Sequence, residues 1–369
     1  MSFFGPPPEI LVAPEAPKGF MAWLEQPHVK WAVPLPLLLA LAPLIWLFFR
    51  STWKELDREA VTYRERLRAE GSEVDYRPLV ALAMGCVILT LQEYYGGSNQ
   101  AFYQTVVVDN LRKWEATHPN GWVNNARFDE LYRLIFWALT RIGGYLVPLL
   151  FWRLIFRRDS ILDFGLRTKG FLEHAWIYAM FVAIMIPVMI TVAKQPDFGT
   201  YYPFYKQASR SWMDFAIWEV FYVGQFFALE IFFRGWWVRA CRGFGAGAIL
   251  CMVVPYCMIH YGKPYLEACG AIVAGTVLGS LSMKTRSIYA GFLVHITVAI
   301  LMDFLALHHR HALPVRLSPT SATTFEFRHT VYVLWAVWGT ALSMLLVTAF
   351  RRRAALRALL RPAEPKELA

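Results

Sequence analysis

Long apolar segments recur along the whole chain, and they constrain its fold more than any other feature. A run of about 18 or more apolar residues is long enough to cross the hydrocarbon core of a membrane as a helix. Hydrophobic residues make up 57% of the chain and charged residues only 17%, too few for the surface of a soluble protein of this size. The sequence therefore predicts an all-α, polytopic membrane helical bundle with about nine transmembrane helices. We expect these helices at residues 32–49, 78–95, 131–156, 174–193, 215–238, 244–261, 265–282, 287–307 and 330–350.

Lysine and arginine are concentrated in every second connector between the expected spans. Arg58, Arg167, Arg239, Arg286 and Arg352 are examples from the five basic segments. The positive-inside rule places such segments in the cytoplasm. The pattern predicts an integral protein of the plasma (inner) membrane, with the amino terminus outside and the carboxyl terminus cytoplasmic. It also accounts for the net charge of +10 without any nucleic-acid partner.

The expected spans and connectors divide the chain into three parts. Residues 1–130 form an amino-terminal extension with two transmembrane helices, a cytoplasmic helix over 51–75 and an external loop domain over 96–130. Residues 131–307 form the helical core. Residues 308–369 supply an external loop, a final transmembrane helix and a basic cytoplasmic tail.

Among the ionisable residues inside expected spans, four stand out: Glu230 and Arg234 in the fifth, His260 in the sixth and His295 in the eighth. Ionisable groups are costly to insert into a membrane, so they are candidates for a functional role. The simpler interpretation of Glu230 and Arg234, four residues apart on one helix face, is an internal ion pair. A lone intramembrane histidine can likewise be only a hydrogen-bonding residue between helices.

The depths of these four residues argue that they belong together. At a helical rise of about 1.5 Å per residue, they lie about 12 to 20 Å from the cytoplasmic boundary. By the same measure Asp303 lies about 25 Å deep, outside the group, and Glu219 lies about 16 Å from Glu230 along the axis. We therefore expect the four residues to line one cavity, with Glu219 no nearer than its mouth.

A carboxylate and two imidazoles at one depth predict a hydrolytic site. Glu230 could act as the general base for a water molecule, with the two histidines stabilising a developing oxyanion, and this mechanism needs no cofactor. Alternatively, Glu230, His260 and His295 could bind Zn²⁺ as a metal site. A proton-coupled transporter is a weaker alternative, because the chain shows no paired halves with matched broken helices.

The motifs around these residues resemble the CPBP family (CAAX protease and bacteriocin-processing, also called Abi), which includes the type II CAAX prenyl endopeptidases. The family motifs E-E-x-x-x-R, F-x-x-x-H and H-x-x-x-N are similar to Leu229–Arg234, Tyr256–His260 and His295–Ala299. The segment Asp163–Gly170 is similar to the L-G-L-R stretch that opens the family domain. The resemblance covers roughly residues 160–307.

The resemblance implies an intramembrane endopeptidase acting on a membrane-embedded or lipid-linked peptide in the bilayer. It implies that Glu230 is the base or a carboxylate ligand and that Arg234 orients it, while His260 and His295 support the oxyanion or a metal. Three positions depart from the family pattern: Leu229 replaces the first glutamate, Tyr256 the phenylalanine and Ala299 the asparagine. Because the family base is the first glutamate, a catalytically inactive scaffold that binds a membrane peptide is the main alternative.

Overall fold

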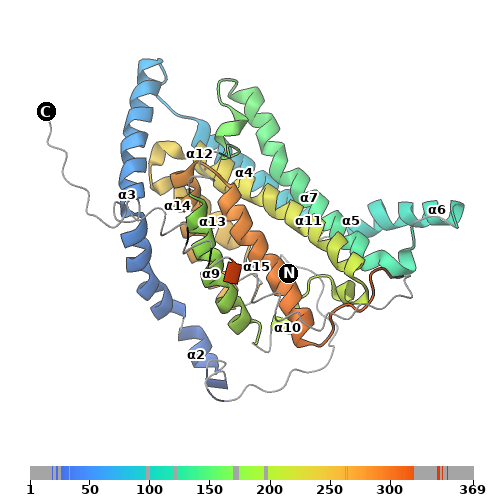
Figure 1. Ribbon diagram of the computed structural model, residues 1–369. Helices are drawn as coiled ribbons and strands as arrows, with labels where there is room; N and C mark the ends of the chain where they lie inside the picture. Colours follow the sequence, from blue (N-terminus) through green and yellow to red (C-terminus); the bar gives the residue numbers. More distant parts are fainter. Residues whose placement is uncertain are drawn as a thin grey trace.

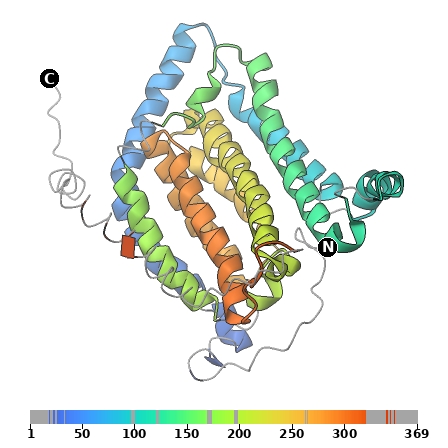
Figure 2. The ribbon, with the colours of Figure 1, turned by 45° about the vertical axis from the view of Figure 1, so that its right-hand side comes forward.

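The computed structural model describes residues 34–96, 100–119, 123–168, 174–194, 198–261 and 265–319, together with Lys263 and scattered positions nearer both ends. Helices lying side by side make up this part of the chain (Figures 1 and 2). Extended pairing among the described residues consists of isolated bridges, such as that between Leu166 and Ser287. The predicted all-α bundle is therefore confirmed.

Six helices of the described part are long and apolar enough to cross a membrane. Two further apolar helices are shorter, and the eight together coincide with the first eight predicted spans. The predicted ninth span, 330–350, lies outside the described residues except for isolated positions, so the count of nine stays a prediction. The long helices are α3 (Pro34–Ala69), α4 (Arg77–Tyr95), α7 (Asn125–Ile155), α11 (Trp212–Glu230), α14 (Tyr265–Thr285) and α15 (Tyr289–His309). The shorter ones are α9 (Ala175–Val192) and α13 (Gly247–Met258).

The structure gives more detail for two segments of the amino-terminal extension. The expected cytoplasmic helix over 51–75 is the second half of α3, because no glycine or proline interrupts the chain between Arg50 and Ala69. The expected loop domain over 96–130 contains consecutive helical segments, α5 (Gln100–Tyr103), η1 (Gln104–Val108) and α6 (Asp109–Thr117). These segments project from the side of the bundle in Figure 1.

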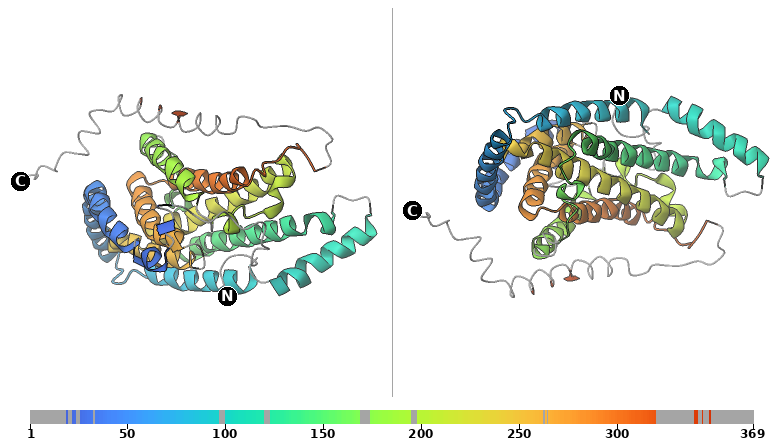
Figure 3. Two further views of the ribbon diagram at one scale, coloured as in Figure 1. Left: turned by 90° about the horizontal axis from the view of Figure 1, so that it is seen from below. Right: turned by 90° about the horizontal axis from the view of Figure 1, so that it is seen from above.

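Helix α11 occupies the middle of the bundle. It packs along α7 on one side and against α15 on the other. Seen along the bundle, α9 lies beside α15 at one face, and α4 lies beside α7 at the opposite face (Figure 3). A residue in the second half of α11 is therefore surrounded by protein. This position explains how Glu230 and Arg234 are kept from lipid.

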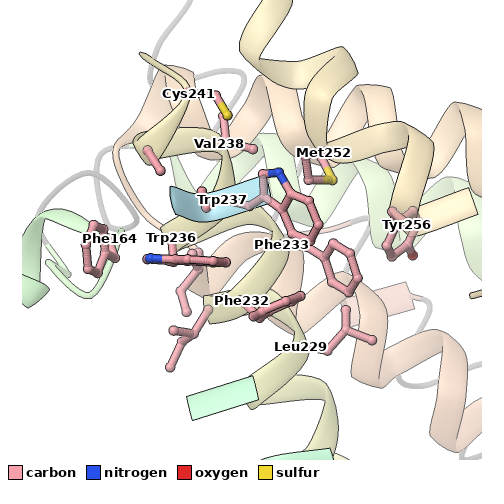
Figure 4. Packing of buried hydrophobic residues seen from close by; sticks show 14 of the residues in the cluster. Phe164, Leu229, Phe232, Phe233, Trp236, Trp237, Val238, Cys241, Met252 and Tyr256 are labelled. Atoms are coloured by element: carbon pink, nitrogen blue, oxygen red, sulfur yellow. The ribbon is translucent and has the colours of Figure 1, made fainter. Parts of the chain in front are cut away.

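Helix α11 continues without a break into a π-helix, η4 (Ile231–Trp237), and then into α12 (Val238–Ala240). Turns of π-helix are rare and occur often at functional sites. Four large aromatic side chains of η4, all buried, pack on one another and on their neighbours (Figure 4). The Phe232 and Trp236 rings stack with centroids 5.2 Å apart, and the Phe233 ring meets Tyr256 at 5.5 Å.

Gly235 allows the chain before α9 to approach η4 closely. A Cβ atom at Gly235 would collide with the backbone carbonyl oxygen of Phe164. A backbone atom cannot rotate away as the end of a side chain can, so this position requires glycine. The contact fixes the loop that contains Phe164 against the core of the bundle.

We expect Gly235→Ala to destabilise the protein by about 1–3 kcal/mol, because a methyl group forced into a packed contact displaces backbone. Gly143→Ala is the matched control, since a Cβ at this helical glycine of α7 meets no atom within 4 Å. Thermal unfolding in detergent measures both variants. Equal unfolding midpoints for the two variants would contradict the close approach at Gly235.

Candidate functional site

Glu230 and Arg234 form an ion pair in the interior of the bundle, as their spacing predicts. Both side chains are fully buried, and Arg234 Nη1 donates to Glu230 Oε1. The Arg234 guanidinium carbon lies 4.6 Å from the centroid of the Tyr256 ring, a cation–π distance. Glu230 Oε2 and Arg234 Nε and Nη2 have no hydrogen-bond partner among the described residues. The pair thus keeps unused hydrogen-bonding capacity at the centre of the protein.

His295 of α15 contacts the same carboxylate. Its Nδ1 lies 3.0 Å from Glu230 Oε1, and its ring packs against Phe226 with centroids 4.2 Å apart. A carboxylate can only accept, so Nδ1 carries the proton and Nε2 keeps a lone pair. Gly291, one turn earlier in α15, permits this approach, since a Cβ there would lie 2.7 Å from Glu230 Oε2. Glu230 therefore orients His295.

His260 lies just beyond the end of α13, not within a helix as predicted. The helix ends at Met258, and it contains Pro255, which cannot donate a backbone hydrogen bond. His260 Nδ1 lies 2.8 Å from the carbonyl oxygen of Tyr256, and the side chain is buried. Because a carbonyl oxygen only accepts, Nδ1 again carries the proton and Nε2 keeps the lone pair.

The two histidines line one cavity of about 20 Å³, enough for one water molecule. Glu230 and Arg234 do not line it, which corrects the prediction that all four residues face one cavity. Leu229 lines it instead, because consecutive residues of a helix point about 100° apart. The residues lining the cavity are Trp137, Arg141, Phe204, Tyr222, Gln225, Phe226, Leu229, Ile259, His260, Lys263 and His295.

The predicted zinc ligands are not arranged as a metal site. No group of three or more His, Cys, Asp or Glu side chains in the described part of the chain could hold a metal ion. The Glu230 carboxylate is already paired with the Arg234 cation, and its Oε1 also lies against His295 Nδ1. The residues present do not fit a Zn²⁺ site built from Glu230, His260 and His295.

Two cationic residues of the cavity were not singled out by the sequence. Arg141 of α7 is buried, with its guanidinium carbon 4.8 Å from the Trp137 ring centroid, and its Nη1 donates to the Tyr145 hydroxyl at 3.1 Å. Lys263 Nζ lies 2.6 Å from Glu267 Oε1. Arg141 falls inside the predicted span 131–156. Because a charged residue in a membrane span is costly, its position alone could have marked Arg141 as a candidate functional residue.

Two other buried acids lie away from the cavity. Asp303 accepts hydrogen bonds from Trp218 Nε1 at 2.8 Å and from the backbone amide of Phe204 at 3.2 Å. This agrees with its predicted place outside the group. Glu219 is buried but does not line the cavity. Ala299, where the family motif has asparagine, lies in an apolar cluster.

The comparison with known families confirms the resemblance found in the motifs. A family model described as "Rce1-like: Type II CAAX prenyl endopeptidase Rce1-like" matches residues 211–301. This range contains Glu230, Arg234, His260 and His295. Neither a curated protein nor a solved structure matches the chain. The part of the chain that holds the buried ion pair and both histidines is therefore similar to a family of membrane proteases.

We expect Arg234→Met to destabilise the protein by about 3–5 kcal/mol, because it leaves a buried carboxylate without its cation. The double variant Glu230→Gln/Arg234→Met should recover most of this loss, since both charges are then absent. Unfolding midpoints in detergent give the comparison.

Arg112→Met is the control for loss of an arginine from an exposed ion pair. Arg112 lies 4.0 Å from Asp109, both side chains are more than half exposed, and such pairs contribute at most about 1 kcal/mol. If the Arg234 variant and the double variant unfold at the same temperature, Glu230 does not need a cation.

Proposed function

We propose that this integral membrane protein is an endopeptidase that hydrolyses a peptide bond in a membrane-associated or lipid-linked substrate. One observation carries the proposal. His295 Nδ1 lies 3.0 Å from the buried Glu230 carboxylate, while the His295 ring lines the water-sized cavity together with His260. An imidazole oriented by a carboxylate is the arrangement that activates nucleophiles in hydrolases.

In the proposed reaction His295 is the general base. Its Nε2 takes a proton from the water molecule as the water oxygen attacks the peptide carbonyl carbon. The same proton then passes to the leaving amine nitrogen as the C–N bond breaks. Glu230 holds the reactive tautomer of His295 and stabilises the imidazolium that forms, and Arg234 neutralises and positions Glu230. Glu230 thus acts on water through His295.

The other residues of the cavity have complementary roles in this proposal. His260 Nε2 accepts the second hydrogen of the water, which turns the oxygen lone pair toward the carbonyl. Arg141 and Lys263 place positive charge beside the negative charge that develops on the carbonyl oxygen. The cavity has room for the water only, so the lining side chains must move when a peptide binds. We place the arginine-rich end of the bundle in the cytoplasm by the positive-inside rule.

We expect Glu230→Ala, His260→Ala and His295→Ala each to lower peptide cleavage by at least roughly 100-fold, the usual contribution of a general base. Cleavage of a mixture of membrane-embedded and prenylated peptides in proteoliposomes, followed by mass spectrometry, provides the measurement. A chelator should leave the wild-type rate unchanged.

His309→Ala is the matched control, because His309 is an exposed histidine at the end of the same helix as His295. Its cleavage rate should equal that of the wild type. Undiminished cleavage by all three site variants would contradict the proposed active site.

A scaffold that binds a membrane peptide without cleaving it is the second candidate. The observation that favours it is Leu229, which lines the cavity at the position where the family motif has its first glutamate. Ala299, which lies in an apolar cluster, adds to this argument because it removes the polar group of the last motif. Both positions can be changed to the family residues.

We expect Leu229→Glu/Ala299→Asn to raise the rate of hydrolysis by roughly tenfold or more, because it adds a second base that faces the water directly. Leu229→Gln/Ala299→Asn is the control, since glutamine has nearly the same shape without a titratable group. Substrate binding and the rate of cleavage are measured for the wild type and for both double variants. Substrate binding without cleavage in the wild type and in both variants would favour the scaffold.

A further inference from the structure

A cleft of about 740 Å³ opens at the end of the bundle where the basic connectors meet. It lies between the second half of α3, the segment around η2 (Ile161–Asp163), the turn η5 (Arg242–Phe244) and the turn between α14 and α15. Six arginines line it, against three carboxylates, so the cleft has an excess of positive charge. The arginines are Arg58, Arg66, Arg167, Arg239, Arg242 and Arg286, and the acids are Glu55, Glu59 and Asp163.

The walls of the cleft are held in place by the fold. Arg286 has a φ of 55°, in the left-handed region that costs free energy for a residue other than glycine. The turn that contains it is tied to the loop before α9 by the bridge between Leu166 and Ser287. The amide of Ile288 also donates to the carbonyl oxygen of Gly165 at 3.0 Å. Arg286 and Arg167, each next to a residue of this bridge, are therefore held beside each other at the cleft.

The arginines of the cleft are only partly paired. Arg239 makes no hydrogen bond or ion pair with the described residues, and its Nε atom is buried. Arg242 Nε and Arg286 Nη1 are likewise buried without an acceptor within the described part of the chain. Leaving such donors unsatisfied is costly, so this cluster calls for an anion with several acceptor oxygens.

The positive-inside rule alone does not explain this cluster. Other arginines at the same end of the bundle also satisfy this rule, namely Arg153, Arg157 and Arg158. None of these three lines the cleft. The residues between the arginines are also distinctive, because Leu56, Ala60, Leu162 and Met283 give the same cleft an apolar wall. A strongly basic cleft with an apolar wall matches a ligand that is anionic at one end and apolar next to it.

We propose that this cleft binds a phosphate group. Guanidinium groups match the oxygens of phosphate in a bidentate geometry, which lysine cannot reproduce. Two sources present this chemistry at a membrane surface: the headgroup of an anionic phospholipid, whose acyl chains would meet the apolar wall, and a soluble phosphate. The site is separate from the cavity of His260 and His295, with which it shares no lining residue.

The test uses the full chain, purified and delipidated in a neutral detergent. Phosphatidylglycerol, phosphate-free diacylglycerol and inorganic phosphate are titrated separately, and the shift of the unfolding midpoint reports binding. We expect saturable stabilisation by phosphatidylglycerol and none by diacylglycerol. Arg239→Gln should weaken phosphatidylglycerol binding roughly tenfold, the loss typical of one charged hydrogen-bonding group. Arg153→Gln, the same change at an exposed position outside the cleft, should bind like the wild type.

Arg167→Gln provides a second variant in the cleft, because the Arg167 side chain is 57% exposed and its loss should not affect folding. Competition between inorganic phosphate and phosphatidylglycerol, with the lipid binding more tightly, identifies the headgroup as the source. Binding of inorganic phosphate as tight as that of the lipid, with the same dependence on Arg239, identifies a soluble phosphate. Equal binding of diacylglycerol and phosphatidylglycerol, or unchanged lipid binding in both cleft variants, would overturn the proposal.

Discussion

The fully buried ion pair between Glu230 and Arg234 is the interaction on which the rest of the site depends. A carboxylate inside a membrane protein is tolerable only when its charge is compensated and its oxygen atoms are hydrogen-bonded. Arg234 supplies the charge and His295 supplies a second hydrogen bond. Both conditions require α11 to lie in the middle of the bundle and α15 to approach it closely, and Gly291 permits that approach. The position of the buried charge thus depends on the packing of α11 against α15.

Much of this arrangement follows from the sequence because it rests on local rules. The length of the apolar runs predicts the helices, and the spacing of four residues predicts the contact between Glu230 and Arg234. The depth along each span brings His295 to Glu230. The basic connectors after the first, third, fifth and seventh spans contribute arginines to a single cleft, as their alternation implies.

What the sequence could not supply depends on rotation and on contacts between distant segments. Depth alone does not say which face of α11 borders the cavity, so Leu229 and not Glu230 lines it. The π-helix after Glu230 depends on packing that no local pattern describes. Arg141 lies on α7, outside the motifs, and reaches the cavity only because α7 packs along α11. The contact of Gly235 with Phe164 likewise joins segments about 70 residues apart in the chain.

The geometry of the cavity changes the interpretation of Leu229. In the proposed mechanism the base that faces the water is the imidazole of His295, and the carboxylate stands behind it. A base of this kind does not need a carboxylate on the cavity wall. The replacement of the first glutamate therefore leaves a single carboxylate in the motif, that of Glu230, which Arg234 and His295 both contact.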